Sequence, residues 1–285
     1  MPAIDLHIHS TASDGRFAPA DIVRKSAAAG LNVIAIADHD TVDGIAPALE
    51  AAVAFPELKV IPGVEISTDF PGGEVHILGY FIDYTDRELR STLEKMRNSR
   101  WERARGMVAK LNNMGVQIQW QRVQEIAAGG ALGRPHIAQA MLEKGYIRSI
   151  KEAFDKYIGH GGPAYVEREK ITPVAAVELV LRTGGLPVLA HPLTISDPET
   201  LIIELKSAGL VGIEACYKDY SPAEISRLVN LAEKYGMIIT GGSDYHGLDD
   251  SAETMLGGVD VPTESVEQLM AMAEQRGLTL PSPSA

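Results

Sequence analysis

Eight histidines and a set of carboxylates are the residues of this 285-residue chain that could carry out chemistry together. His7 and His9 are two residues apart, and Asp244 and His246 repeat this spacing with a carboxylate and an imidazole. On an extended strand, residues at this spacing point to the same side, so both members of a pair can reach one ion. Mixed nitrogen and oxygen ligands suit Zn, Mn or Fe. The two pairs therefore predict metal ligation.

Further candidate ligands lie at or just beyond the ends of short apolar runs. The candidate histidines are His7, His9, His39, His76, His191 and His246, and the carboxylates that accompany them are Asp5, Asp14, Asp38, Asp40, Glu65 and Asp244. Singly, most have an ordinary interpretation, such as a turn at Asp14-Gly15 or a hydrogen-bonded core histidine at His76. Jointly, burying so many ionisable groups without cations would be costly. The pattern therefore predicts two or three divalent cations. Glu65 has two oxygens and can bridge two ions at the ~3.5–4 Å separation of two-metal hydrolytic sites.

The elements that position these residues are short β-branched runs with the length of strands. They span residues 4–9, 33–38, 60–67, 75–81, 186–191, 211–215 and 237–244. Helical patterns lie between many of them, at residues 19–29, 41–55, 198–208 and 222–235. This alternation predicts a parallel α/β sheet with helical crossovers. In a closed barrel, the carboxyl ends of parallel strands converge on one face, where six of the histidines are expected to meet.

The segment from residue 86 to residue 159 interrupts this alternation, because it contains no convincing strand. Apolar residues recur at helical spacing over residues 86–114, and residues 121–128, 134–143 and 150–158 have the pattern of shorter helices separated by glycines. We expect a barrel formed by residues 1–98 and 163–285, with a helical insertion domain at residues 99–162.

Composition narrows the class of protein further. Hydrophobic residues make up 45% and charged residues 22%, as in an ordinary globular protein, and no apolar run is long enough to span a bilayer. The net charge of −12 argues against a broad nucleic-acid-binding surface. It is compatible with an anionic substrate, because bound divalent cations can reverse the local charge. One cysteine, Cys216, and no signal-peptide pattern predict a cytoplasmic location.

Six motifs resemble those of the polymerase-and-histidinol-phosphatase (PHP) superfamily, in the same order: DLHIHSTASDG from Asp5, IADHDT from Ile36, GVEIS from Gly63, VHILG from Val75, AHP from Ala190 and GSDYH from Gly242. The resemblance implies a distorted (β/α)7 barrel that holds three ions. Its first ion would take His7, His9, Glu65 and Asp244, the second Glu65, His76 and His191, and the third Asp14, His39 and His246. Some members of the superfamily have histidine where this chain has Asp14. The carboxylate makes the site harder, which favours Mn over Zn.

The insertion and its motif Gly133-Arg-Pro-His136 resemble the TrpH-type branch of this superfamily, which includes 3′,5′-nucleoside bisphosphate phosphatases and a 5′→3′ exoribonuclease activity. Arg134 can bind a phosphate bidentately, and Pro135 suits the first turn of a helix whose N-terminus attracts anions. His136 could bind phosphate or donate a proton. Arg168 belongs to a second candidate phosphate-binding loop. Without the resemblance, both segments also fit a helix start and a loop with solvated charges.

The resemblance implies that this enzyme removes the 3′-phosphate of a nucleoside 3′,5′-bisphosphate and leaves the 5′-monophosphate. The ions would lower the pKa of a bound water toward ~7, and the resulting hydroxide would attack phosphorus in line. Arg134 and the ions would stabilise the phosphoryl oxygens, and Asp40, His136 or a metal-bound water could protonate the leaving oxygen. The alternatives are stepwise 5′→3′ cleavage of short RNA, a histidinol-phosphate phosphatase and a non-catalytic metal-binding module. The expected partners are a small nucleotide or a short oligonucleotide, and no membrane.

Overall fold

The structure is a computed structural model that describes residues 3–70, 73–127, 132–167, 171–248 and 254–278. The chain divides into two compact units. One comprises residues 1–93 and 170–285, and the other comprises residues 94–169. The expected boundaries at residues 98/99 and 162/163 lie five residues after the first observed division and seven residues before the second.

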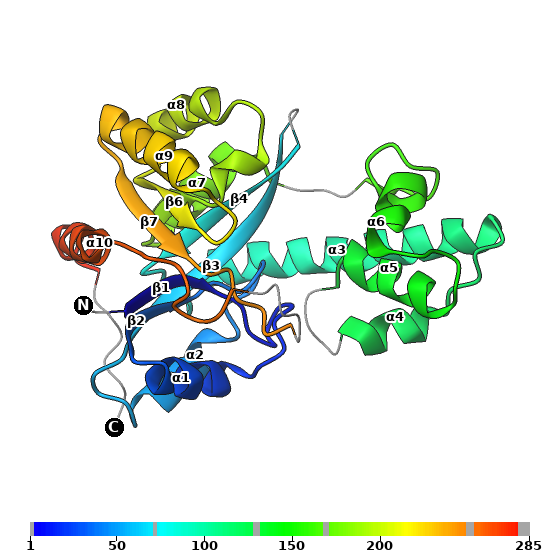
Figure 1. The fold of residues 1–285 in the computed structure, drawn as a ribbon, viewed down its shortest axis with the longest axis horizontal. Coiled ribbons are helices and arrows are strands. Elements are labelled where there is room, and N and C mark those ends of the chain that lie inside the picture. The colour runs from blue at the N-terminus through cyan, green and yellow to red at the C-terminus, as the bar shows by residue number, and fades with distance from the viewer. Residues whose placement is uncertain (1–2, 71–72, 128–131, 168–170, 249–253, 279–285) are drawn as a thin grey trace. The chain divides into compact units, whose positions relative to one another are not determined.

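The first unit is built around a seven-stranded sheet whose spatial order equals the chain order (Figure 1). Its strands are β1 (Ala3–Ile8), β2 (Leu31–Ile36), β3 (Lys59–Phe70), β4 (Gly73–Tyr80), β5 (Leu186–Leu189), β6 (Gly212–Tyr217) and β7 (Ile238–Gly242). All seven lie where the apolar runs predicted strands. Ile8 forms a parallel bridge with Tyr245, beyond the end of β7, which brings the two edges of the sheet together. The architecture is the predicted distorted α/β barrel, nearly closed.

Gly242 shows why the two edges approach so closely. A Cβ atom at this position would lie 2.5 Å from the backbone nitrogen and from the Cβ of His7. Real Cβ atoms do not tolerate such contacts, so only glycine lets the end of β7 pack against β1. The residue that follows the closure, Ser243, then donates its backbone N–H to the buried carboxylate of Asp5 at 2.9 Å.

The prediction of an all-parallel sheet is wrong at β4, which is antiparallel to both β3 and β5. Phe70 of β3 pairs directly with Gly73 of β4, so only two residues connect the strands. A parallel crossover needs a dozen or more residues, whereas a connection this short joins antiparallel strands. The other strand pairs of the barrel, β1 with β2, β2 with β3, β5 with β6 and β6 with β7, are parallel.

The helices of the barrel unit are α1 (Pro19–Ala28), α2 (Ile45–Ala52), α7 (Pro173–Arg182), α8 (Pro198–Ala208), α9 (Pro222–Tyr235) and α10 (Thr263–Gln275), with a short 3₁₀ turn at Pro192–Thr194. Side-chain caps begin several of them, such as Asp197 before α8 and Ser221 before α9. The helix expected from residue 41 is shorter than predicted. Asp40 has a φ of 50°, and the chain turns before α2 begins.

Apolar side chains fill both faces of the sheet. Ile22 and Val23 of α1 are fully buried and belong to one cluster with Ile8, Ile34 and Ile36. A second cluster joins strand residues to α10, whose Leu269 is fully buried. Because these β-branched strands are covered, they can carry polar groups at their ends without losing their packing.

The second unit is helical, as the sequence predicts. It contains most of α3 (Arg87–Asn113), then α4 (Trp120–Ala127), α5 (Arg134–Glu143), α6 (Ile150–Ala153) and a π-helical turn at Phe154–Ile158. Its own core includes Met107, Leu111, Val123, Ile137 and Met141, all fully buried. A separate core of this kind is what lets a segment form a compact unit.

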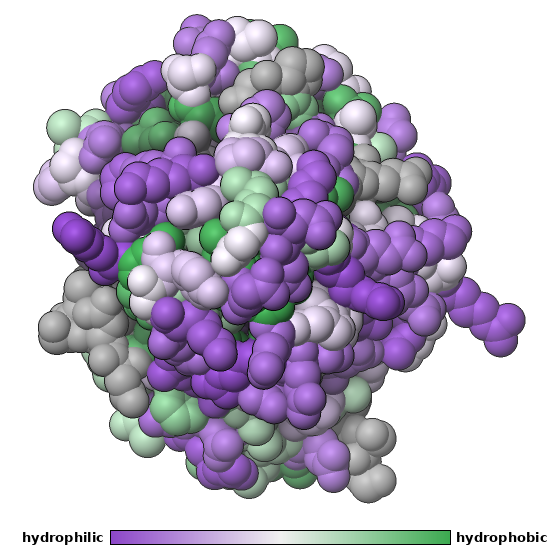
Figure 2. Space-filling view, turned by 90° about the vertical axis from the view of Figure 1, so that its right-hand side faces the viewer, coloured by the Kyte–Doolittle hydropathy of each residue, from purple (hydrophilic) through white to green (hydrophobic). Residues whose placement is uncertain are grey.

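The surface agrees with the composition. Figure 2 shows a face covered mainly by hydrophilic residues, with hydrophobic residues in small groups among them. Such scattered groups are normal on a water-exposed face. Among the described helices, none combines the length and the apolar character that crossing a bilayer requires.

Candidate metal centre

The structure brings all nine predicted ligand residues into one connected cluster within the barrel unit. His7 and His9 come from β1 and the residue beyond its end, and their rings lie 5.1 Å apart. Asp14 lies in the loop before α1, His39 after β2, Glu65 within β3 and His191 after β5, and Asp244 and His246 follow β7. These positions collect at one rim because the carboxyl ends of parallel barrel strands meet there.

His76 reaches this rim by a different route from the predicted one. It lies near the beginning of β4, paired with Ser67 of β3, and not at the carboxyl end of a strand. Since β4 runs antiparallel to β3, its N-terminal part lies beside the C-terminal part of β3. The same reversal that contradicts the all-parallel prediction therefore places His76 beside Glu65.

Glu65 is the centre of the cluster, 1% exposed, and its carboxylate lies close to five imidazoles. Oε2 is 3.3 Å from Nε2 of His7, 3.3 Å from Nε2 of His9 and 2.9 Å from Nδ1 of His39. Oε1 is 2.7 Å from Nδ1 of His76 and 3.0 Å from Nε2 of His191. The two oxygens thus serve two different groups of histidines, as a bridging carboxylate requires.

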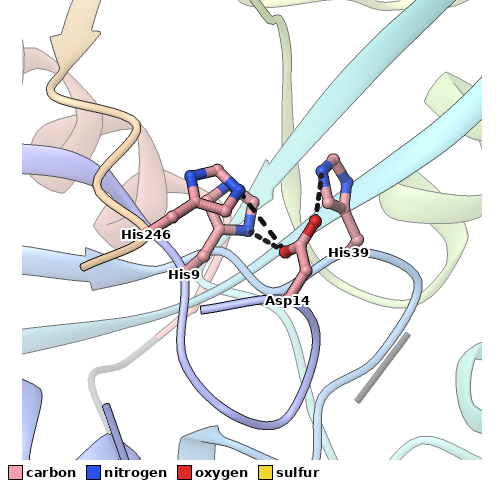
Figure 3. A group of neighbouring side chains, drawn as sticks. All are labelled: His9, Asp14, His39 and His246. Carbon is pink, nitrogen blue, oxygen red and sulfur yellow. Dashed lines mark ion pairs between the residues drawn. The ribbon is translucent and has the colours of Figure 1, made fainter. Parts of the chain in front are cut away.

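Asp14 organises a second group on the same rim. Figure 3 shows its carboxylate between the rings of His9, His39 and His246. Oδ1 lies 3.6 Å from Nδ1 of His9 and 3.4 Å from Nε2 of His246, and Oδ2 lies 3.8 Å from Nε2 of His39. Together the four side chains form a candidate metal-holding group. Two further groups of this kind are His7, His9 and Glu65, and His39, Glu65 and His76.

Two buried carboxylates hold the loops that carry these ligands. Asp38 accepts hydrogen bonds from the backbone N–H of Ser10 at 2.7 Å and from the hydroxyl of Ser13 at 2.6 Å, which fixes the loop before Asp14. Asp5 accepts from the backbone and hydroxyl of Ser243, next to Asp244. Their hydrogen-bonding capacity is used within the loops, so they position ligands and are not themselves candidates.

Backbone strain also concentrates at this rim. Four non-glycine residues in the described part of the chain have positive φ, and three of them belong to the site: Asp40 at 50°, His191 at 27° and Asp244 at 48°. Such conformations cost free energy and persist only where surrounding contacts impose them. Strained backbone of this kind clusters at functional sites, so its concentration here supports a functional role for this rim.

The charges of the cluster depend strongly on one another. Burial raises the pKa of Glu65, but the imidazoles of His39, His76 and His7 outweigh burial and hold it well below its ordinary value. Burial lowers the pKa of His76, yet the neighbouring Glu65 carboxylate raises it to about 10. Burial and the nearby His246 lower the pKa of His9 to about 4. The cluster therefore mixes protonated and neutral imidazoles around ionised carboxylates.

These residues fit divalent cations. In the described part of the chain, ten buried side-chain nitrogen or oxygen atoms lack a hydrogen-bond partner, and seven belong to the cluster: His7 Nε2, His9 Nδ1 and Nε2, Asp14 Oδ1, His39 Nδ1, Glu65 Oε2 and His191 Nδ1. Buried polar atoms are almost always satisfied, so such a concentration needs an explanation. Cations ligated by these lone pairs would satisfy the atoms and neutralise the carboxylates.

Three residues near the cluster were not predicted as part of the site: Glu214 inside β6, Tyr217 at its last position and Lys218 directly after it. Glu214 is fully buried and accepts from Nδ1 of His7 at 2.9 Å and from the backbone N–H of His191 at 2.8 Å. Tyr217 and Lys218 contact Asp244. The available signal was a glutamate inside an otherwise apolar strand, followed by polar residues where that strand ends.

Replacing Glu214 by glutamine is expected to weaken the binding of divalent cations by about 10–100-fold. A carboxylate on the second nitrogen of a ligating histidine fixes the tautomer and raises the basicity of the ligand, and losing such a partner has an effect of this size. A calorimetric titration with Mn²⁺ measures the affinity. Glu199→Gln is the matched surface control, because the Glu199 carboxylate accepts hydrogen bonds from Lys234 and Tyr235 away from the cluster. Unchanged affinity in a folded Glu214→Gln protein would contradict the role of Glu214.

Asp40, a predicted proton donor, is fully buried beside the cluster, and its Oδ1 accepts the backbone N–H of Ser67 at 2.8 Å. The predicted substrate-binding residues Arg134 and His136 lie in the first turn of α5, in the helical unit. Nδ1 of His136 accepts the N–H of Gly133 at 3.0 Å, so Nε2 carries the proton of the neutral ring. Arg134 lies 5.3 Å from the centre of the Phe154 ring. Arg168 lies outside the described residues.

Comparisons with known proteins agree with this geometry. The PHP domain matches residues 5–182 of the chain. A 5′-3′ exoribonuclease of Haemophilus influenzae is 33% identical over 248 residues, which cover 85% of this chain and 89% of the relative. A 3′,5′-nucleoside bisphosphate phosphatase of Chromobacterium violaceum is 30% identical over 272 residues, covering 92% and 93%.

A solved structure of a candidate metal-dependent phosphoesterase from Bifidobacterium adolescentis has a TM-score of 0.83 to this structure at 27% sequence identity, and the match covers 98% of each chain. The match to the PHP domain spans more than half of the chain, and both curated relatives hydrolyse phosphoesters by name. With the cluster of imidazoles and carboxylates at the barrel rim, these matches identify the chain as a member of the PHP domain family and a metal-dependent phosphoesterase.

Proposed function

We propose that this enzyme hydrolyses the 3′-phosphate of nucleoside 3′,5′-bisphosphates and releases nucleoside 5′-monophosphates. The observation that carries the proposal is the convergence of six histidines on Glu65 and Asp14, in a chain similar to a bisphosphate phosphatase over 92% of its length. The similar exoribonuclease supports a second candidate, stepwise 5′→3′ cleavage of short RNA.

Three ions, with Mn favoured and Zn or Fe as alternatives, are proposed to occupy the cluster. His7, His9, Glu65 and Asp244 hold the first ion, and Glu65 with His76 and His191 holds the second. Asp14, His39 and His246 hold the third. Support comes from the two carboxylate oxygens of Glu65: Oε1 faces His76 and His191, whereas Oε2 faces His7 and His9 and also Nδ1 of His39. The hard carboxylate of Asp14 supports the preference for Mn.

Bound divalent ions would supply a nucleophilic hydroxide at neutral pH and stabilise the charge on the phosphoryl oxygens. The chain's own residues orient this chemistry. Arg134 is proposed to bind a phosphate of the nucleotide through its guanidinium, and His136 to donate a hydrogen bond from Nε2. His136 and Asp40 are both kept as proposed proton donors, because the hydrogen bonds favour neither: the Ser67 N–H stabilises the ionised carboxylate of Asp40, and the Gly133 N–H donated to Nδ1 stabilises the neutral ring of His136.

The test is phosphate release from adenosine 3′,5′-bisphosphate in the presence of Mn²⁺, comparing the wild type with His9→Ala and Asp244→Ala. Both variants are expected to lose turnover by more than about 100-fold. Removing an outer-shell partner of a metal ligand lowers activity by up to about 100-fold, and removing the ligand itself should lower it further. Turnover retained in both variants would remove the assigned ligands from the reaction. An Arg134→Met variant is expected to raise KM while leaving Mn²⁺ affinity unchanged.

Substrate choice needs a side-by-side assay of adenosine 3′,5′-bisphosphate and a short 5′-phosphorylated RNA. Faster turnover of the bisphosphate supports the first candidate, with inorganic phosphate and the 5′-monophosphate as the only products. If only the oligonucleotide reacts, and mononucleotides appear one at a time from its 5′ end, the exoribonuclease is the correct function.

A further inference from the structure

The two carboxylate oxygens of Asp244 face different surroundings. Oδ1 points to the cluster, 3.0 Å from Nε2 of His9 and 3.6 Å from Nε2 of His7. Oδ2 accepts the hydroxyl of Tyr217 at 2.8 Å and lies 3.0 Å from Nζ of Lys218. Two donors, one of them charged, therefore occupy the oxygen that faces away from the histidines.

Both donors are held in place by their own neighbours. Tyr217 ends β6, and its ring lies 5.5 Å from the ring of His191 and 5.1 Å from that of Tyr220. Nζ of Lys218 also donates to the backbone carbonyl of Asp244 at 3.1 Å. This second bond ties the lysine to a residue whose backbone is itself constrained, with a φ of 48°. A charge-assisted bond of this kind is stronger than a neutral one.

We propose that Tyr217 and Lys218 are positioning residues that restrict Asp244 to one metal-binding oxygen, Oδ1, and so make the site select against large cations such as Ca²⁺. This inference rests on the proposed role of Asp244 as a ligand. Ca²⁺ takes six to eight oxygens and often binds both oxygens of a carboxylate. Smaller divalent ions need fewer ligands at shorter distances, so a one-oxygen Asp244 suits them better.

The experiment is the displacement of Mn²⁺ by Ca²⁺ from Mn-loaded protein, followed by the electron paramagnetic resonance signal of free Mn²⁺. In the double variant Tyr217→Phe/Lys218→Met, Oδ2 is released and can join Oδ1 on one ion. In this variant the ratio of Ca²⁺ affinity to Mn²⁺ affinity is expected to rise by about tenfold over the wild type, so less Ca²⁺ displaces half of the bound Mn²⁺. A change of this size is within the range known for outer-shell partners. The single variants are expected to give smaller shifts, and Lys218→Arg, which keeps a charged donor, is expected to restore most of the selectivity.

Matched controls come from the same molecule. Tyr235→Phe removes a hydroxyl that donates to Glu199, and Lys234→Met removes an exposed lysine paired with Glu199. Neither is expected to change the ratio of Ca²⁺ to Mn²⁺ affinity. The ratio is the decisive quantity, because a general loosening of the fold weakens both ions together.

A double variant that weakens both ions equally, or that leaves the ratio as in the wild type, would overturn the inference. Should the double variant not fold, Tyr217→Phe alone decides, because it removes one donor and little volume. The variant Asp244→Ala distinguishes a failure of this inference about Tyr217 and Lys218 from a failure of the proposed metal site. If this variant binds Mn²⁺ as tightly as the wild type, Asp244 is not a ligand, and both the ligand assignment and the inference fall.

Discussion

Replacing Glu65 by glutamine is expected to lower both Mn²⁺ affinity and the rate of phosphate release by more than about 100-fold. Glu65 would contact two ions directly, and the loss of an outer-shell partner alone lowers affinity or activity by up to about 100-fold. The carboxylate is 1% exposed and lies within 3.3 Å of five imidazole nitrogens. Glutamine has almost the same shape but no charge, and its amide group can offer only one oxygen. The bridge between the two groups of histidines is therefore lost while the volume is kept.

Calorimetric titration with Mn²⁺ and phosphate release under saturating nucleotide measure the two effects of Glu65→Gln separately. Glu88→Gln is the matched control, because Glu88 is 53% exposed and pairs with Arg182 on the surface. A Glu65→Gln protein that binds the full number of ions and turns over at the wild-type rate would show that the central carboxylate does not bridge metals.

Metal affinity is expected to rise steeply between pH 7 and pH 9. Burial lowers the pKa of His246, but the hydrogen bond that its ring donates to the Asp14 carboxylate outweighs burial and raises the pKa to about 9, and Glu65 raises the pKa of His76 to about 10. Burial lowers the pKa of His7 as well, but the carboxylates of Glu214 and Glu65 outweigh burial and raise the pKa well above its ordinary value. All three rings are therefore protonated in the metal-free protein near neutral pH. A metal needs the unprotonated nitrogen, so filling the cluster displaces about three protons, and the overall binding constant rises by about 1,000-fold per pH unit.

The sign of this dependence follows from which state holds the protons. Below pH 9 the metal-free protein binds more protons than the loaded protein, so raising the pH favours loading. The gains from His246 and His76 end as pH passes their pKa values of about 9 and about 10. Titrations at pH 7.5 in two buffers with different ionisation enthalpies count the released protons directly. His246→Asn is expected to release about one proton fewer, whereas His160→Asn, in the helical unit, is expected to change nothing. A proton count near zero in the wild type would contradict the assigned charges.

The chemistry of the site is readable in the sequence because it depends on residue types and short spacings. The separations within His7-Ile8-His9 and Asp244-Tyr245-His246 already place two ligands on one side of an extended chain. Helices α8 and α9 begin and end at their predicted residues, because proline, capping side chains and glycine mark those ends locally. The substrate is not readable in this way, since chains of similar sequence carry the names of a phosphatase and of an exoribonuclease.

Residue type and local spacing determined by themselves which side chains could ligate metal, which seven segments are strands, where helices α8 and α9 lie, and that a helical unit interrupts the barrel. They did not predict helices α7 and α10. Only the tertiary structure decided that β4 runs antiparallel, that Glu65 lies between five histidines, and that Glu214 reaches His7 across 207 positions of the chain. The physical reason is that ligand type and helix ends depend on neighbouring residues. The surroundings of a carboxylate oxygen depend on strand direction and register, which are set by packing over the whole barrel.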